Sequence, residues 1–294
     1  MRTFYFADLC FEAISKIKSV PNFHGPRFSA LLRFASIRAN MNFNECCIGV
    51  MPFRYGSNVI IEGEMLRVRL ILTEDGASCL SRLTNALTVT SGQGEFSSVT
   101  LRLSAVYDGI SGKEIVFDQN GCLLQPFTAD VIEDEVKALT CFRYFTLDFF
   151  SPLRLLLPPG RKLSRASKLD RLCREDFFAK DDLSLLHVVS SIREMGEWAG
   201  PKALLEEIPL PWSCATEWTE VKYSRERQIH LDGITGKIRF KGKIPSKDMV
   251  ERLVAGQYLG LGHDRRFGDG FYRIPELNPA RHISMPKVVN QDRY

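Results

Sequence analysis

The chain has 294 residues, of which 45% are hydrophobic and 25% charged, a composition typical of a globular protein with one large or two ordinary domains. No apolar run approaches membrane-spanning length, the N-terminus lacks a secretory pattern, and none of the eight cysteines forms a C-x-x-C pair, so a reducing, cytoplasmic location is favoured over a membrane, a disulfide framework or a zinc ribbon. The net charge is only +4, but residues 220–294 contain fifteen Lys and Arg against nine Asp and Glu, which predicts a polyanionic partner for this region.

The first half of the chain alternates between strand and helix patterns. In chain order we predict a strand over 3–11, a helix over 27–39, a strand over 58–73, a helix over 76–88 and a strand over 96–107. The first helix and the second strand each have one apolar face, formed by Phe28, Leu31, Leu32 and Ala35 in the helix and by Leu66, Val68, Leu70 and Leu72 in the strand. Residues 108–125 are rich in glycine and polar residues and predict loops or hairpins. The order is that of a β-α-β-β-α-β ferredoxin-like domain, which we place at residues 1–125, with a linker over 126–141.

A second copy of this order is predicted over residues 142–275. Its elements are a strand from 142, a long helix over 183–199, a strand over 233–243, a helix capped by Ser246 that ends at Gly256, and a last strand over 271–274. The predicted fold class is therefore α+β, with two tandem ferredoxin-like (RRM-like) domains and a C-terminal glycine-rich loop over 256–270. Residues 276–294 form a tail without apolar periodicity.

The strand over 233–243 carries an unusual charge pattern. Ile234, Ile238 and Phe240 share one face at a period of two, and Lys237, Arg239 and Lys241 share the other. Two further cations, Arg225 and Arg227, precede the strand. The outward face is either an ordinary solvated surface or a groove that follows a phosphate backbone.

The glycine-rich loop combines flexible main chain with cations. Gly260, Gly262, Arg265 and Arg266 lie between a helix and a strand, whereas a dinucleotide-binding turn leads from a strand into a helix and would need glycine at position 265. No G-x-x-x-x-G-K-[ST] motif occurs, which argues against a nucleotide triphosphatase. Exposed main-chain N–H groups and two guanidinium groups could together bind a phosphodiester. The alternative is a glycine-rich turn whose arginines are only solvated.

Four features taken together resemble a known family. They are Ser151-Pro152-Leu153-Arg154 after a strand, the basic strand, the short helix, and the Gly-Leu-Gly…Phe-Gly-Asp-Gly-Phe-Tyr loop. This pattern is similar to the C-terminal half of the CRISPR-associated endoribonucleases of the RAMP superfamily, which process precursor CRISPR RNA. The match covers residues 142–275, and the first half matches only in its layout.

The resemblance implies a function and a set of partners. Members of the family bind CRISPR repeat RNA and cleave it without metal or cofactor, by attack of a 2′-hydroxyl on the adjacent phosphate. The crRNA product can stay bound, which implies other subunits of a CRISPR effector complex as partners. Two alternatives stay open: a non-catalytic RNA-binding subunit of such a complex, and an unrelated ferredoxin-like enzyme acting on a small molecule.

Histidine is the natural acid or base for this reaction, because its ordinary pKa is close to 6.5. His24, next to Arg27 at the start of the first helix, is the first catalytic candidate, since family catalytic histidines lie in or near that helix. His263, in the glycine-rich loop, is the rival and is favoured as an RNA contact. The full set of predicted RNA-binding residues is Arg225, Arg227, Lys237, Arg239, Lys241, Gly260, Gly262, His263, Arg265 and Arg266.

Overall fold

The structure is a computed structural model in which a part of the chain is described. The described residues are 3–14, 18–19, 25–53, 59–87, 100–117, 124–153, 211–219, 233–242, 244, 247–261 and 265–277. The predicted helix over 183–199 and the tail from 278 onward lie outside these residues. Among the helices of the described part, none has the length and apolar character needed to cross a membrane.

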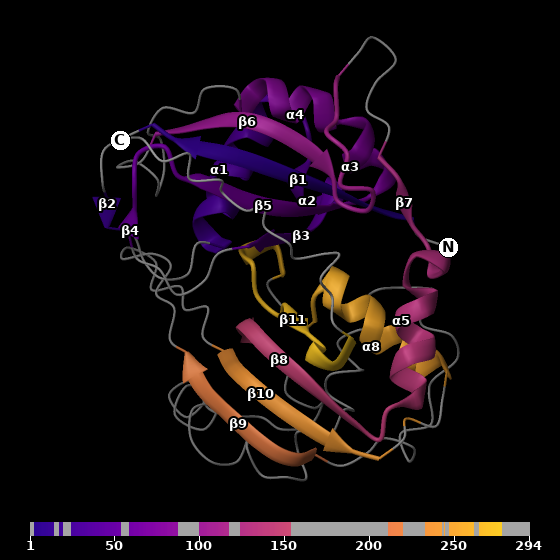
Figure 1. Ribbon diagram of the computed structural model, residues 1–294. Coiled ribbons are helices and arrows are strands. Elements are labelled where there is room, and N and C mark those ends of the chain that lie inside the picture. Colours follow the sequence, from indigo (N-terminus) through magenta and orange to yellow (C-terminus); the bar gives the residue numbers. More distant parts are fainter. Residues whose placement is uncertain are drawn as a thin grey trace, which may run out of the picture.

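The first half forms one antiparallel sheet with helices on one face (Figure 1). Its main strands are β1 (Phe4–Ala13), β3 (Cys47–Pro52), β5 (Met65–Leu72) and β6 (Leu101–Asp108), in the order β3-β5-β1-β6. The helices are α1 (Gly25–Arg38), α2 (Phe43–Cys46), α3 (Glu74–Ser78) and α4 (Leu80–Leu87). A short ladder joins β2 (Lys18–Ser19) to β4 (Val59–Ile60). The predicted β-α-β-β-α-β order is confirmed.

The second half repeats this strand order. Its elements are β8 (Tyr144–Leu153), β9 (Pro211–Thr219), β10 (Gly233–Lys241), α8 (Lys247–Leu259), the 3₁₀ turn η3 (Arg265–Phe267), β11 (Tyr272–Arg273) and the 3₁₀ turn η4 (Pro275–Leu277). The sheet order is β11-β8-β10-β9, with every pair antiparallel. In both sheets the last strand pairs with the first, the first with the third, and the third with the second. The chain is therefore an α+β protein with two tandem ferredoxin-like units.

The predicted apolar faces are buried as expected. Phe28, Leu31, Leu32 and Ala35 of α1 pack under the first sheet together with the even-numbered apolar positions 66–72 of β5. In the second half, α8 buries Met249, Val250, Leu253 and Val254. Every second residue of the strand is buried, and one face of each helix is buried, as strand and helix geometry require.

Three predicted elements differ from the structure. The strand over 58–73 is two strands, β4 and β5, because Gly63 takes a φ of 81° in the turn between them. The alternation over 96–107 breaks where β1 and β6 shift register, so that Val106 rather than Ala105 becomes buried. The helix expected to end at Gly256 continues to Leu259, and Gly260, with a φ of 73°, follows its last residue.

The segment predicted as a linker contains two elements of its own. They are β7 (Pro126–Phe127) and α5 (Ala129–Cys141). β7 pairs with the start of β1, whereas α5 packs against α8 of the second half. The segment therefore ties the two halves together. The strand β3 was also not predicted, although Cys47–Pro52 is a short apolar run of strand length.

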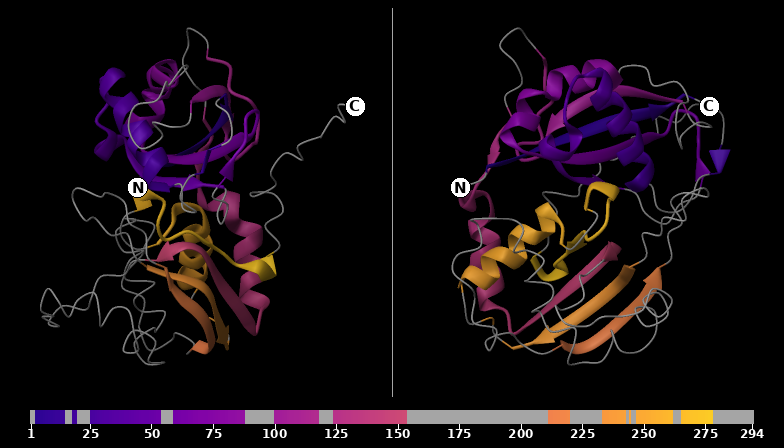
Figure 2. Two further views of the ribbon diagram at one scale, coloured as in Figure 1. Left: turned by 90° about the vertical axis from the view of Figure 1, so that its left-hand side faces the viewer. Right: turned by 180° about the vertical axis from the view of Figure 1, so that it is seen from behind.

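A shared hydrophobic core joins the two sheets. α8 and η3 lie between them in the views of Figure 1 and Figure 2, and Tyr258 of α8 meets two rings of the first half. Its ring centroid is 6.2 Å from that of Phe6 and 5.2 Å from that of Phe127. The open face of the first sheet is thus covered by the helix layer of the second half. The open face of the second sheet has no such helix from the described residues.

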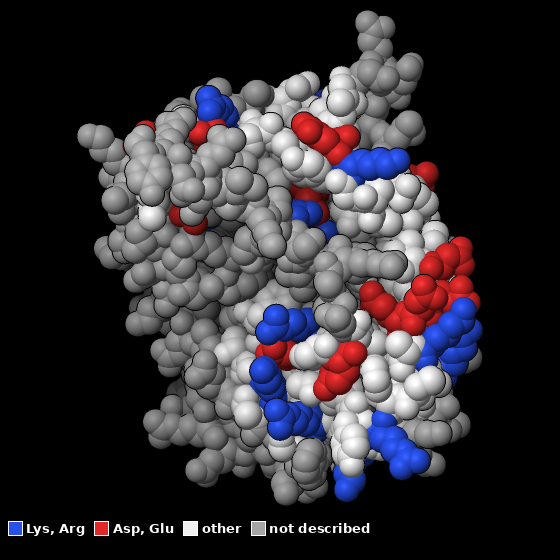
Figure 3. Space-filling model, in the orientation of Figure 1, with Lys and Arg blue, Asp and Glu red and all other residues white. Residues whose placement is uncertain are grey.

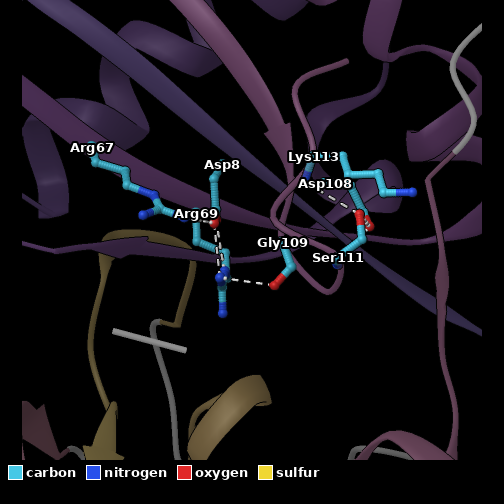
Figure 4. A network of polar contacts seen from close by, with 7 residues as sticks. All are labelled: Asp8, Arg67, Arg69, Asp108, Gly109, Ser111 and Lys113. Carbon is cyan, nitrogen blue, oxygen red and sulfur yellow. Dashed lines mark hydrogen bonds and ion pairs between the residues drawn. The ribbon is translucent and has the colours of Figure 1, made fainter. Parts of the chain in front are cut away.

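A buried ion pair completes the covered face of the first sheet (Figure 4). Arg69 donates from Nε and a terminal nitrogen to the two oxygens of Asp8, at 2.7 and 2.8 Å, and also donates to the carbonyl of Gly109 at 3.1 Å. Arg67 donates to the same carboxylate. Burial by itself raises the pKa of Asp8, but the charges and hydrogen bonds of Arg69 and Arg67 outweigh it and hold that pKa below its ordinary value.

Candidate nucleic-acid interface

The outer face of β10 carries the predicted row of cations. Lys237, Arg239 and Lys241 are exposed, whereas Ile238 and Phe240 between them are each 1% exposed and pack on the core. The strand geometry fixes this separation because successive side chains point to opposite sides of a sheet. The predicted alternation is confirmed. With about 3.3 Å per residue, the three charges follow the strand at intervals of roughly 7 Å.

Two carboxylates described on this face, Asp148 and Glu276, are engaged by other groups. Asp148, opposite Lys237 in the β8–β10 ladder, accepts hydrogen bonds from Arg273 at 2.9 and 2.8 Å. Glu276 accepts from the main-chain nitrogen of Thr146 at 3.0 Å and from its hydroxyl at 2.6 Å. Within the described part of the chain, no carboxylate forms an ion pair with Lys237, Arg239 or Lys241. The described part of the chain therefore leaves the charge of this row unneutralised.

The surface view shows the consequence (Figure 3). Lys and Arg side chains are spread over the second sheet, in the lower half of the picture, with only a few Asp and Glu side chains among them. On the neighbouring strand β9, the residues opposite Arg239 and Lys237 are Ser213 and Ala215, both exposed. Small side chains beside a row of cations leave room for a polymer to lie flat on the sheet.

The glycine-rich segment packs on its own main chain. Leu261 donates its N–H to the carbonyl of Gly270 at 2.8 Å, and Gly270 donates to the carbonyl of Pro152 at 2.7 Å. A Cβ on Gly270 would lie 1.6 Å from the Leu261 oxygen, so only glycine fits there. These two N–H groups are used inside the protein and not for an anion. Gly262 and His263 lie outside the described residues.

The two loop arginines contact main-chain oxygens of the protein, and their role in RNA binding stays a prediction. Arg266 donates from Nε to the main-chain oxygen of Cys47 at 2.7 Å and from a terminal nitrogen to the oxygen of Asn44. Arg265 is half-buried, and its terminal nitrogen lies 3.5 Å from the Leu259 oxygen. The guanidinium edge of Arg266 thus binds carbonyl groups of the first half, because η3 is seated against β3 and α1.

A stacked arginine strengthens the same contact. The guanidinium carbon of Arg33, on α1, lies 5.3 Å from the ring centroid of Phe43 and 5.2 Å from that of Phe267. Both rings attract the cation, and each contact is worth about 0.5–1 kcal/mol at a partly exposed site. We call Arg33, Phe43, Arg266 and Phe267 the interdomain clasp. It fixes α1, and with it the half-buried Arg27 of its first turn, against the glycine-rich segment.

Of the remaining predicted site residues, the structure describes some and not others. Gly260 is described, with its positive φ and with Phe271 so close that a Cβ would lie 2.9 Å from the ring. His24, Arg225 and Arg227 lie outside the described residues. Among those that are described, no group of three His, Cys, Asp or Glu side chains could hold a metal ion.

Sequence reasoning missed one exposed aromatic on the candidate interface. Tyr144, the first residue of β8, is 51% exposed and is paired across the ladder with Lys241. A signal was available, because Tyr144 alternates with Phe145 in the first strand of the second half and must lie on the same face as the cations once the two strands pair.

The fold defines a class of proteins built from two ferredoxin-like units in tandem. Neither a family model nor a curated protein matches this sequence. Solved structures do match it. A chain of the partial Cas6-RT-Cas1–Cas2 complex is similar with a TM-score of 0.66 and 16% identity, over 93% of this chain and 46% of that one. A chain of the Cas6-RT-Cas1–Cas2 complex gives the same score and identity, over 93% of this chain and 29% of that one.

The Cas6 of Thermus thermophilus is similar with a TM-score of 0.51 and 14% identity, over 93% of this chain and 99% of that one. This chain therefore spans less than half the length of the two chains from the Cas6-RT-Cas1–Cas2 complexes and nearly all of the Thermus protein. It has the fold of the Cas6 structures, and the predicted resemblance to CRISPR-associated processing proteins is confirmed at the level of the fold.

Proposed function

We propose that this chain is an endoribonuclease that binds CRISPR repeat RNA and cleaves it to give mature crRNA. The observation that carries the proposal is the exposed row of Lys237, Arg239 and Lys241 on a sheet face of a Cas6-like fold, with Asp148 and Glu276, the carboxylates described beside it, engaged by other groups. Cations at regular intervals along a strand neutralise successive phosphates, and binding of this kind weakens as the salt concentration rises.

The proposed reaction is metal-independent and needs no cofactor. The 2′-oxygen of the RNA forms a bond to the adjacent phosphorus, the bond to the 5′-oxygen breaks, and a 2′,3′-cyclic phosphate remains. A base removes the 2′-hydroxyl proton and an acid supplies a proton to the leaving oxygen. His24, directly before α1, is the proposed acid or base, and Arg27 in the first turn of α1 is the proposed partner of the phosphorane charge.

The crRNA product is expected to stay bound, with other CRISPR effector subunits as partners. The two long chains that share this fold come from complexes named for Cas1 and Cas2, which supports association with other Cas proteins. Domain limits of 1–125 and 142–275 remain part of the proposal, with 126–141 as the segment that ties the halves together.

The alternative is a non-catalytic RNA-binding subunit of such a complex. One observation favours it: Arg266, which was expected to meet a phosphate in the glycine-rich loop, is used in the interdomain clasp. The row on β10 would serve binding equally well in a protein without a working acid–base pair.

A cleavage assay in EDTA separates these functions. A repeat RNA labelled at its 5′ end is incubated with the protein, and a second RNA carries a 2′-deoxy substitution at the cleaved nucleotide. The endoribonuclease should yield a cyclic-phosphate end from the first RNA only, and His24→Ala should reduce the rate by 100-fold or more, as expected for loss of a general acid or base (about 10²–10⁴). Salt-sensitive binding without cleavage would establish the alternative, and cleavage that survives His24→Ala would reject His24.

A further inference from the structure

Two cysteine side chains meet where α2 packs against α3 in the first half of the chain. Cys46 is the last residue of α2, and its main-chain oxygen accepts from the nitrogen of Thr73, which precedes α3, at 3.0 Å. Gly76 of α3 lies so close that a Cβ there would be 2.1 Å from the same oxygen. The end of α2 is therefore seated directly against α3.

Cys79 lies on the side of α3 that faces Cys46. It is the C-cap of α3, with helical backbone angles (φ −90°, ψ −4°), and it follows Gly76 by three residues, a spacing that shares one helix face. Its side chain shares a hydrogen bond with that of Cys46. Cys46 is buried, whereas Cys79 is half-buried. The two sulfurs are thus neighbours, and solvent reaches one of them.

A cation lies beside the sulfur that solvent reaches. Arg82, an exposed residue of α4, donates from a terminal nitrogen to the Cys79 sulfur at 2.8 Å. Positive charge next to a cysteine favours the thiolate, which is the form that reacts with peroxides. Burial, and then the neighbouring Cys79, raise the pKa of the Cys46 thiol. The two cysteines therefore differ in the way that an attacking and a resolving thiol differ.

We propose that Cys79 and Cys46 form a reversible redox pair, in which a peroxide oxidises Cys79 and Cys46 then closes a disulfide. In the first step the Cys79 thiolate attacks a peroxide oxygen, an S–O bond forms, the O–O bond breaks, and the second oxygen leaves as hydroxide and takes up a proton. In the second step the Cys46 sulfur attacks the Cys79 sulfur, an S–S bond forms, the S–O bond breaks, and the Cys46 proton leaves with the hydroxide as water. The two sulfurs lose two electrons to the peroxide.

The position of the pair gives the disulfide a structural consequence. Cys46 lies between Asn44 and Cys47, and the main-chain oxygens of these two residues accept from Arg266 in the interdomain clasp. A bond from Cys46 to Cys79 would tie this segment to α3 and hold both acceptor groups in place. The inference depends on neither RNA binding nor RNA cleavage.

The test treats the folded, reduced protein with hydrogen peroxide, blocks the remaining thiols with N-ethylmaleimide and analyses a tryptic digest by mass spectrometry without reduction. Trypsin releases Cys46 in the peptide 39–54 and Cys79 in the peptide 70–82. We expect these two peptides joined, lighter by two hydrogens than their sum, and separated again by dithiothreitol. Fragmentation between Cys46 and Cys47 locates the bond without any variant.

Variants test each role. Cys46→Ser and Cys79→Ser should each abolish the joined peptide, whereas Cys141→Ser, at an exposed position at the end of α5, should leave it unchanged. Arg82→Gln should slow its formation by about 2- to 5-fold, the factor for loss of one partly exposed ionic contact. A joined peptide that survives Cys46→Ser, or one that forms only in urea, would overturn the inference, as would its absence from the wild type.

Unfolding tests the structural consequence. The midpoint of urea unfolding should rise when the wild type is oxidised and return with dithiothreitol, because a native cross-link restricts the unfolded chain. Cys46→Ser, treated in the same way, should show no rise. A midpoint that stays or falls in the oxidised wild type would show that the bond does not hold α2 and α3 in their native arrangement.

Discussion

The guanidinium of Arg266 donates to the main-chain oxygen of Cys47 at 2.7 Å, although the two residues are 219 positions apart. The bond crosses from the glycine-rich segment to the first strand after α2. It converts an arginine that resembles a phosphate ligand into a structural contact between the two halves of the chain. Arg266 is thereby used between the two halves, whereas Lys237, Arg239 and Lys241 on β10 face outward.

Arg266→Gln is expected to lower the free energy of unfolding by about 2 kcal/mol, because it removes two hydrogen bonds from a charged donor to carbonyl oxygens. Arg266→Lys should lose most of the same stability, since an ammonium group cannot reproduce the fork. Urea unfolding measures both. Arg239→Gln is the matched control on the exposed face of β10 and should stay within about 0.5 kcal/mol of the wild type. Equal stability of Arg266→Lys and the wild type would mean that charge alone maintains the contact.

Asp8→Asn should destabilise the protein by about 3–5 kcal/mol, because it leaves Arg69, which is 2% exposed, without a counter-ion. The difference should depend on pH. The pKa of Asp8 is lower in the folded protein than in the unfolded chain, so its contribution is present above about pH 4 and is lost as the pH falls through the folded pKa. Thermal unfolding at pH 6 and at pH 2.5 should show the wild type and Asp8→Asn converging at the lower pH. A constant difference would contradict the stated role of the ion pair.

Gly270→Ala and Gly63→Ala form a matched pair. Both glycines have φ near +80°, but only at Gly270 would a Cβ meet a main-chain atom, and nothing lies within 4 Å of the Cβ position at Gly63. Gly63→Ala should therefore cost about 1–2 kcal/mol, the cost of left-handed backbone alone. Gly270→Ala should cost at least 2 kcal/mol more, the scale of a severe packing conflict. Chemical denaturation of the two variants gives the difference, and equal losses would show that the loop relaxes around the added methyl group.

Replacing Lys237, Arg239 and Lys241 together by glutamine should reduce the salt dependence of single-stranded RNA binding. The slope of log K against log salt should fall by about 2, since each lost phosphate contact removes about 0.7. Lys137→Gln, on α5, is the control: this lysine is exposed and paired with Glu133, and the slope should not change. An unchanged slope in the triple variant would place the RNA on another surface.

The interior of the elements was predictable, because local geometry decides which side chains share a face. Lys237 and Ile238 are on opposite faces of β10 whatever the rest of the chain does, and Leu253 is on the buried side of α8 for the same reason. The helix α5 could also have been predicted, since Ile132, Val136 and Leu139 recur at helical spacing after Thr128.

The residue at which α8 ends could be found only from the tertiary structure. Gly256 looks like a helix terminus, but a Cβ there would lie 2.3 Å from the hydroxyl oxygen of Tyr272, which itself donates to the Leu253 carbonyl. Gly256 is thus required because the ring of Tyr272 approaches its main chain closely, and not because the helix ends there. Gly260, four residues later, follows the last residue of the helix.

The sequence by itself determined that the second half has a strand with one apolar and one basic face, because that pattern repeats with the two-residue period of the backbone. Only the tertiary structure decided which cations remain available. Arg266 is bound by carbonyl groups of Cys47 and Asn44, and Arg69 by a buried carboxylate, whereas Lys237, Arg239 and Lys241 face outward beside Tyr144. The physical reason is that an arginine is neutralised or hydrogen-bonded by the polar groups within a few ångströms of its guanidinium. Groups such as the Cys47 oxygen, which is far from Arg266 in the sequence, come within that distance only when the chain folds.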